Sequence, residues 1–100
     1  MSKKRYIVCV NNPKDQQDQA FLTYIKNSGF SWWHYLSNTW LIIDSSGNST
    51  VADIRTKVME YYPQETNMVF QLNEGEGTWS GFGPKSDKAN MFTWINDYWK

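Results

Sequence analysis

The segment from 75 to 86, GEGTWSGFGPKS, carries the side chains best suited to bind an anion. Its glycines let main-chain amides approach an anionic group, and Lys85 adds a positive charge. Ser86 opens an expected helix, whose free N-terminal amides favour a phosphate. Trp79 and Phe82 could stack on a nucleobase beside it. The pattern indicates a nucleotide-type site, and its alternative is a flexible turn whose aromatic rings pack into the core.

The remaining reactive side chains favour structural roles. His34 is the only histidine, so a Ser-His-Asp relay would have to use it, but it lies in mid-strand between Trp and Tyr. A packed or interface histidine is therefore the favoured interpretation. Cys9 lies in an apolar run with no flanking base, which favours a small core residue over a nucleophile. Glu74 and Glu76 belong to a solvated loop and are interpreted as ordinary surface charge.

Length and net charge limit the number of domains and the kinds of binding partner that this chain can have. The 100 residues suffice for one domain, 1–100, with a modest core. Ten basic and ten acidic side chains cancel, so no overall field attracts long nucleic acid or an anionic membrane. The amino end has an apolar run too short for a signal peptide, and no segment approaches the ~20 apolar residues of a membrane span. We therefore expect a soluble cytoplasmic protein that does not contact the membrane.

The stretch around His34 predicts a β-hairpin that would position these groups. Its arms, Ser31 to Leu36 and Thr39 to Ile43, are rich in aromatic and β-branched residues. Ser37-Asn38 between them is a two-residue connection with turn chemistry. Alternate side chains of the hairpin are bulky and largely apolar on both faces. One face can be covered by helices of the same chain, so the second suggests a partner, a ligand or a third layer.

Hydrophobic periodicity, together with residues that begin or end helices and strands, predicts the other elements. Pro13 and Pro63 interrupt the chain, Gly29 suits a helix C-cap, and Thr50 with Asp53 resembles a capping box. The expected strands are 4–10 and 67–72, and the expected helices are 15–27, 51–61 and a last one that opens near residue 86. Among the apolar residues of the second helix, we expect Val51, Ile54, Val58 and either Tyr61 or Tyr62 to be buried.

The resulting order, β-α-β-β-α-β followed by a helix, predicts an α+β fold. Its first six elements are those of the ferredoxin-like fold, in which an antiparallel four-stranded sheet carries two helices on one face. The right-handed crossover rule places the first and third strands side by side in the middle of the sheet. The fold prediction is thus ferredoxin-like with an additional C-terminal helix.

The hairpin sequence also resembles a known family. Residues 32–42, WWHYLSNTWLI, are similar to a block of small bacterial and phage proteins described as SinR-like, and the Trp79-Ser80-Gly81 turn extends the resemblance. That family is related in fold to the CRISPR spacer-acquisition subunit and to the VapD toxins. The resemblance implies a ferredoxin-like homodimer that acts in mobile elements or in phage defence or counter-defence.

One position departs from the nuclease-like relatives. In those proteins an aspartate at the end of the first strand helps to hold a divalent metal across the dimer axis, because hard cations need oxygen ligands. Here Asn11 takes that place, with Asn12 beside it. A neutral amide is a weaker ligand than a carboxylate. A metal-dependent nuclease would therefore lack its central group.

The leading hypothesis is a non-catalytic dimeric binding protein that captures a nucleotide or nucleotide-derived signal, without a cofactor or metal. In this hypothesis Trp40, Trp79, Phe82 and His34 stack on or cover the base, Ser80, Lys85 and Ser86 meet the phosphate, and Asn11 and Asn12 hydrogen-bond at the dimer axis or to ligand edges. Two alternatives stay open. One is a metal-dependent ribonuclease of the toxin type, and the other is a protein–protein inhibitor module, for which the charge of Lys85 would matter little.

Overall fold

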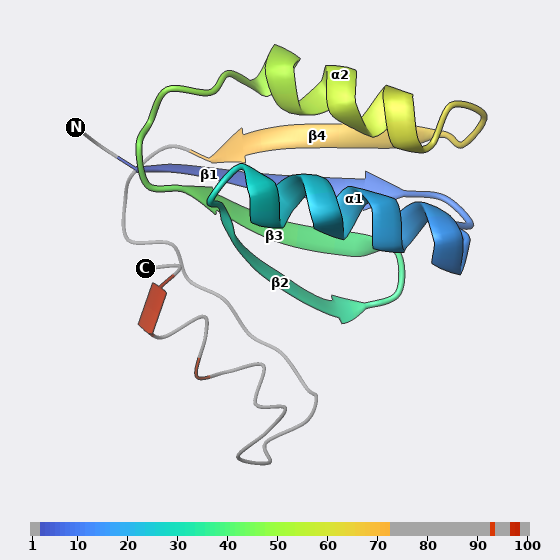
Figure 1. Ribbon diagram of the computed structural model, residues 1–100, viewed down its shortest axis with the longest axis horizontal. Helices are drawn as coiled ribbons and strands as arrows, with labels where there is room; N and C mark the ends of the chain where they lie inside the picture. The colour runs from blue at the N-terminus through green and yellow to red at the C-terminus, as the bar shows by residue number, and fades with distance from the viewer. Residues whose placement is uncertain (1–2, 73–92, 94–96, 99–100) are drawn as a thin grey trace.

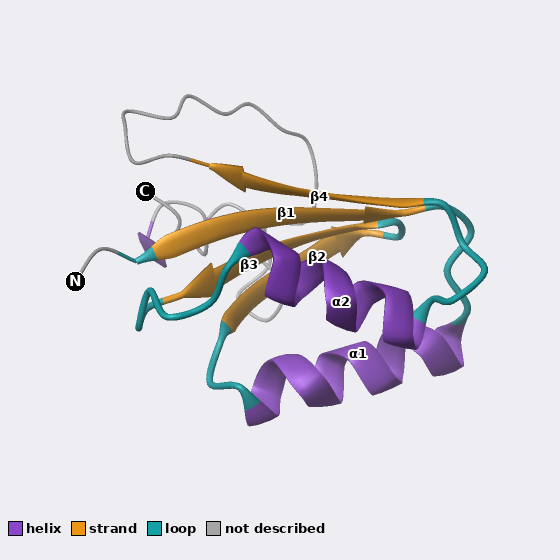
Figure 2. Ribbon diagram, turned by 90° about the horizontal axis from the view of Figure 1, so that it is seen from above, coloured by secondary structure: helices purple, strands orange, loops and turns teal. Residues whose placement is uncertain are grey.

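Two helices cover one face of a four-stranded antiparallel sheet in the computed structural model (Figures 1 and 2). The structure describes residues 3–72, 93 and 97–98. The strands are β1 (Lys4–Val10), β2 (Ser31–Leu36), β3 (Thr39–Asp44) and β4 (Asn67–Leu72), and the helices are α1 (Asp15–Asn27) and α2 (Val51–Tyr61). These bounds confirm the elements predicted from the sequence up to residue 72. The predicted last helix lies outside the described residues, apart from Thr93, Asp97 and Tyr98.

The strand order is β2-β3-β1-β4, with every neighbouring pair antiparallel. The first and third strands therefore lie in the middle, as the crossover rule predicts. In the register, Val8 faces Trp40 of β3 on one side and Val69 of β4 on the other. The hairpin pairing is interrupted between Trp33 and Leu36, where the register shifts. This order brings the end of β1, the β2–β3 turn and the start of β4 together at one end of the strands.

The core lies between the sheet and the two helices. Its buried residues come from β1, β3 and both helices, and they are Tyr6, Val8, Val10, Phe21, Ile25, Trp40, Ile42, Ile54, Val58 and Tyr62. The T-shaped ring contacts of Phe21 with Trp40 and Tyr62, at centroid separations of 5.3 and 5.6 Å, join the layers. Such contacts add about 0.5–1.5 kcal/mol each to the effect of burial.

The first turn of α2 contains the predicted capping box, but Val51 beside it is not buried as predicted. The Thr50 hydroxyl accepts a hydrogen bond from the Asp53 amide at 3.1 Å, and the Asp53 carboxylate accepts one from the Thr50 amide at 2.9 Å. Val51 is 38% exposed, so the prediction that it is buried is wrong. It occupies the first helical position, next to the cap, whereas Ile54 and Val58 point towards the sheet. Tyr62, and not Tyr61, is the fully buried tyrosine that follows the helix.

Candidate functional site

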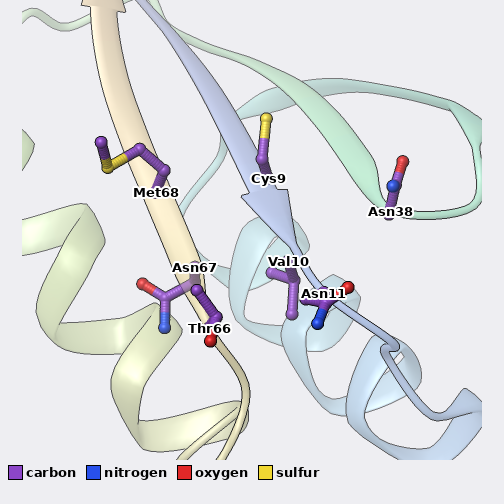
Figure 3. A pocket seen from close by; sticks show the side chains of 7 residues that line it. All are labelled: Cys9, Val10, Asn11, Asn38, Thr66, Asn67 and Met68. Carbon is purple, nitrogen blue, oxygen red and sulfur yellow. The ribbon is translucent and has the colours of Figure 1, made fainter.

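A shallow depression lies where β1 ends, at the end of the sheet that also holds the β2–β3 turn (Figure 3). Its volume is about 340 Å³. The lining residues are Cys9, Val10, Asn11, Asn38, Thr66, Asn67 and Met68. Three carboxamides and a hydroxyl thus surround an opening lined by no charged side chain. Such a lining suits a neutral ligand edge that carries both donors and acceptors.

The chain immediately after β1 adopts a conformation that asparagine favours. The Asn11 amide donates a hydrogen bond to the Thr66 carbonyl at 2.8 Å, which ties the end of β1 to the segment before β4. Asn12 has φ of 51°, in the left-handed region that asparagine tolerates better than most residues. Both asparagines are exposed. Asn11 therefore has its backbone fixed in the depression, while Asn12 forms the turn beside it.

The carboxamides of the depression offer different hydrogen-bonding groups. The Asn67 Nδ2 atom donates to the Glu65 carbonyl at 2.9 Å, which leaves its oxygen to accept. The Asn38 Oδ1 atom accepts from the Thr39 hydroxyl at 3.1 Å, which leaves its amino group to donate. The Asn11 carboxamide makes no hydrogen bond within the described part of the chain. The lining of the depression therefore includes both a free donor and a free acceptor.

His34 is held by ring stacking and by a hydrogen bond from one ring nitrogen. Its ring stacks on that of Trp40 with centroids 3.7 Å apart and planes 3° from parallel. Nδ1 lies 2.9 Å from the Thr39 carbonyl, which can only accept, so Nδ1 donates. Nε2 lies 3.8 Å from a carboxylate oxygen of Asp18. The stacked ring and the Nδ1 hydrogen bond agree with the packed histidine that the sequence favours.

His34, Asp18 and Tyr62 form a polar cluster between the sheet and α1. The buried Tyr62 hydroxyl donates to Asp18 Oδ1 at 2.6 Å. Burial, followed by the hydrogen bond to Asp18 and the charge of that carboxylate, raises the pKa of Tyr62 well above its ordinary value. Tyr62 therefore stays protonated and serves as a donor. Trp40 is 2% exposed, so its ring packs in the core and does not face the depression.

Asp44 is the buried carboxylate of the described chain, and it caps a loop. Its two oxygens accept four hydrogen bonds of 2.6–3.0 Å, from the amide and hydroxyl of Ser46 and of Ser49. Burial opposes ionisation, but these hydrogen bonds outweigh it and lower the pKa of Asp44 from 3.8 to about 2. All its acceptor directions serve the fold. Asp44 thus has the features of a structural anion, and not those of a general acid.

The structure brings together only part of the predicted site. Asn11 lines the depression and Asn12 forms the turn beside it, whereas His34 and Trp40 lie in a separate cluster between the sheet and α1. The predicted residues Trp79, Ser80, Phe82, Lys85 and Ser86 lie outside the described residues. Sequence reasoning missed Asn38, Thr66 and Asn67. The signal that could have found them was the predicted strand order, which places the β2–β3 turn and the start of β4 beside the end of β1.

The described residues form an α+β structure with a neutral depression lined by amides. Comparisons with known proteins do not assign this chain to a family. No family model matches the sequence, and neither a curated protein nor a solved structure matches the chain. Among the described residues, no three or more His, Cys, Asp and Glu side chains gather where they could hold a metal ion. Within the same part of the chain, no helix has the length and apolar character needed to cross a membrane.

Proposed function

We propose that this protein is a non-catalytic, dimeric binding protein of the ferredoxin-like fold that captures a nucleotide or nucleotide-derived signal. The observation that carries the proposal is the depression at the end of β1, whose lining includes three carboxamides and no charged side chain. A nucleobase edge has donors and acceptors side by side, and asparagine side chains pair with such edges. The base would therefore bind against Asn11, Asn38 and Asn67.

The fold part of the proposal is supported by the strand order β2-β3-β1-β4 with α1 and α2 on one face. That order and the alternation of helices and strands are the ones a split β-α-β arrangement requires. The setting in phage–bacterium conflict is supported by the resemblance of residues 32–42 to SinR-like proteins. The phosphate of the ligand would be met by Ser80, Lys85 and Ser86, and Trp79 and Phe82 would cover the base.

The non-catalytic part is supported by how the reactive groups of the described chain are used. His34 is stacked on Trp40 with its Nδ1 donating to the main chain, and the Asp44 carboxylate accepts four hydrogen bonds from its own loop. By the resemblance, Asn11 takes the place of the metal-binding aspartate of the nuclease-like proteins, and an amide cannot replace the charge of that ligand. The ribonuclease alternative would be revived by RNA cleavage that needs magnesium or manganese and survives rigorous purification.

A protein-docking module is the second candidate, because one observation favours it. The sheet face opposite the helices exposes large apolar side chains at Tyr35, Met68 and Phe70, by 39, 57 and 47%. Exposed apolar side chains that gather on one face are typical of protein interfaces. A partner protein on this face would not need the carboxamides of the depression. The two functions therefore predict different sensitive residues.

Titration calorimetry with the four ribonucleosides and their 5′-monophosphates tests the proposal. We expect at least one of them to bind, and Asn11→Ala to weaken it about 5- to 10-fold, the effect of one lost hydrogen bond. Asn27→Ala is the matched control, since Asn27 is an exposed asparagine at the end of α1 far from the depression. Lys85→Ala should weaken only the monophosphates. Absence of binding to all eight probes, or equal effects of both asparagine variants, would refute the proposal.

A further inference from the structure

The edge strand β4 lacks the features that usually protect a sheet edge. Within the described part of the chain its one strand neighbour is β1. Its sequence, NMVFQL, has no charged residue and no proline. Its pairing with β1 runs without a register shift from Asn67 to Leu72. Natural edge strands are usually blunted by charges, prolines or bulges, because an open edge pairs readily with another strand.

The register shows which main-chain groups of β4 face outward. Asn11 and Thr66 continue the register of β1 and β4 by one pair, and the Asn11 amide donates to the Thr66 carbonyl. In an antiparallel ladder, hydrogen-bonded pairs alternate with pairs that are not hydrogen-bonded. Thr66 and every second residue after it therefore bond to β1. The amides and carbonyls of Asn67, Val69 and Gln71 point away from β1, towards the edge that no described strand covers.

We propose that β4 pairs antiparallel with β4 of a second copy of this chain, about a two-fold axis at Val69. Residues that face each other in an antiparallel pair lie on the same side of the sheet, so the axis passes beside a residue and not between two residues. Centring on Val69 pairs Asn67 with the partner subunit's Gln71. This register uses all the outward groups and forms about six main-chain hydrogen bonds, two for each facing pair.

The same register is complementary in its side chains. It sets Met68 beside the partner subunit's Phe70 on the face away from the helices, in the closer of the two kinds of cross-strand pair. These side chains are 57 and 47% exposed in the single chain, so pairing buries apolar surface twice, once on each side of the axis. Met68 of each copy meets Phe70 of the other, so the same sequence supplies both sides of the interface. A second copy of the chain is therefore the fitting partner.

The pairing bears on the depression because Met68 lines it. The partner subunit's Phe70 would stand against Met68 and add an aromatic wall to an opening that is shallow in the single chain. An aromatic wall beside carboxamides is the combination that holds a nucleobase by stacking and by its edge. This last link rests on the proposed function, whereas the strand pairing does not.

Sedimentation equilibrium of the full chain tests the interface. We expect a dimer for the wild type, and Phe70→Lys should raise its dissociation constant about 100-fold, because two apolar contacts are lost. Tyr35→Lys is the matched control, since Tyr35 is an exposed aromatic residue on β2, the opposite edge strand. Circular dichroism verifies that both variants fold. A monomeric wild type, or a dimer sensitive to Tyr35→Lys and not to Phe70→Lys, would overturn the proposal.

Disulfide trapping in a Cys9→Ser background tests the register. Val69→Cys places two thiols across the axis with Cα atoms about 5.5 Å apart, within the range that a disulfide spans. Gln71→Cys lies on the same face, but its copy is about 14 Å away along the strands, too far to bridge. Bridging by Gln71→Cys alone would overturn the register, and bridging by neither would overturn the pairing. A bridged dimer that binds no nucleoside would refute only the proposed function.

Discussion

The carboxylate of Asp44 makes the stability of this fold depend on acid pH in a way that can be worked out from its contacts. It is 2% exposed and accepts four hydrogen bonds from Ser46 and Ser49, and its pKa falls from 3.8 to about 2. A group whose pKa is depressed in the folded state adds stability above its unfolded pKa, and this stability is lost as the pH falls through the folded pKa. The contribution is therefore complete at pH 7 and lost progressively below about pH 5.

The depressed pKa sets the magnitude of the effect. A fall from 3.8 to about 2 corresponds to about 2 kcal/mol at pH 7. About half of this, roughly 1 kcal/mol, should be lost between pH 7 and pH 3. Asp44→Asn removes the ionisable group and turns amide hydrogens towards two of the four donors. We expect it to lower the free energy of unfolding by about 2–4 kcal/mol at pH 7, and by less at pH 3.

Urea unfolding followed by tryptophan fluorescence measures this difference. The quantity to compare is the gap between wild type and Asp44→Asn at pH 7, 5 and 3, because the titration of other groups cancels in it. Asp15→Asn serves as the control, since Asp15 is exposed in the first turn of α1 and should change stability by less than about 1 kcal/mol. A gap that stays constant from pH 7 to pH 3 would contradict the assignment of Asp44 as a structural anion.

Two further predictions concern the polar cluster and the turn after β1. Tyr62→Phe keeps the buried ring but removes the donor to Asp18, so we expect about 1 kcal/mol of lost stability with an unchanged urea m-value; a neutral result would show that water replaces the hydroxyl without cost. The φ of Asn12, 51°, disfavours a branched side chain, so Asn12→Val should lower the free energy of unfolding by about 1–2 kcal/mol and lower the thermal midpoint with it. Asn12→Gly should lower neither. Equal midpoints for the two Asn12 variants would contradict the left-handed conformation.

The sequence could predict the elements because local chemistry and hydrophobic period agree along the chain. Thr50 and Asp53 form the expected capping box, and Gly29 has the positive φ that a helix terminus favours. The strand order followed from handedness and not from any single residue. The burial of Val51 failed because period alone does not tell the first position of a helix, beside its cap, from the positions that reach the sheet.

The candidate site was less predictable because its members come from three separate segments. Asn38 reads as a turn residue, and Thr66 and Asn67 read as the approach to a strand. Nothing in the local sequence marks these residues as a site, and only the strand order shows that they lie near Asn11. The burial of Asp44 had a similar cause, since DSSGNS looks like an exposed polar loop and its hydrogen bonds to one carboxylate depend on how the loop folds back.

The distribution of charge in the described chain is itself an argument for binding by neutral contacts. Ionisable groups that approach the core are paired within the fold, as Asp44 is with its loop and Asp18 with Tyr62. Two surfaces of the sheet are neutral: the carboxamides at the end of β1 and the uncharged edge strand β4. Neutral surfaces give little electrostatic steering, so recognition must come from shape, stacking and hydrogen bonds at short range. Nucleoside binding and dimer formation should therefore change little with salt, whereas binding of the monophosphates should weaken as salt rises, because Lys85 contacts their phosphate in the proposed complex.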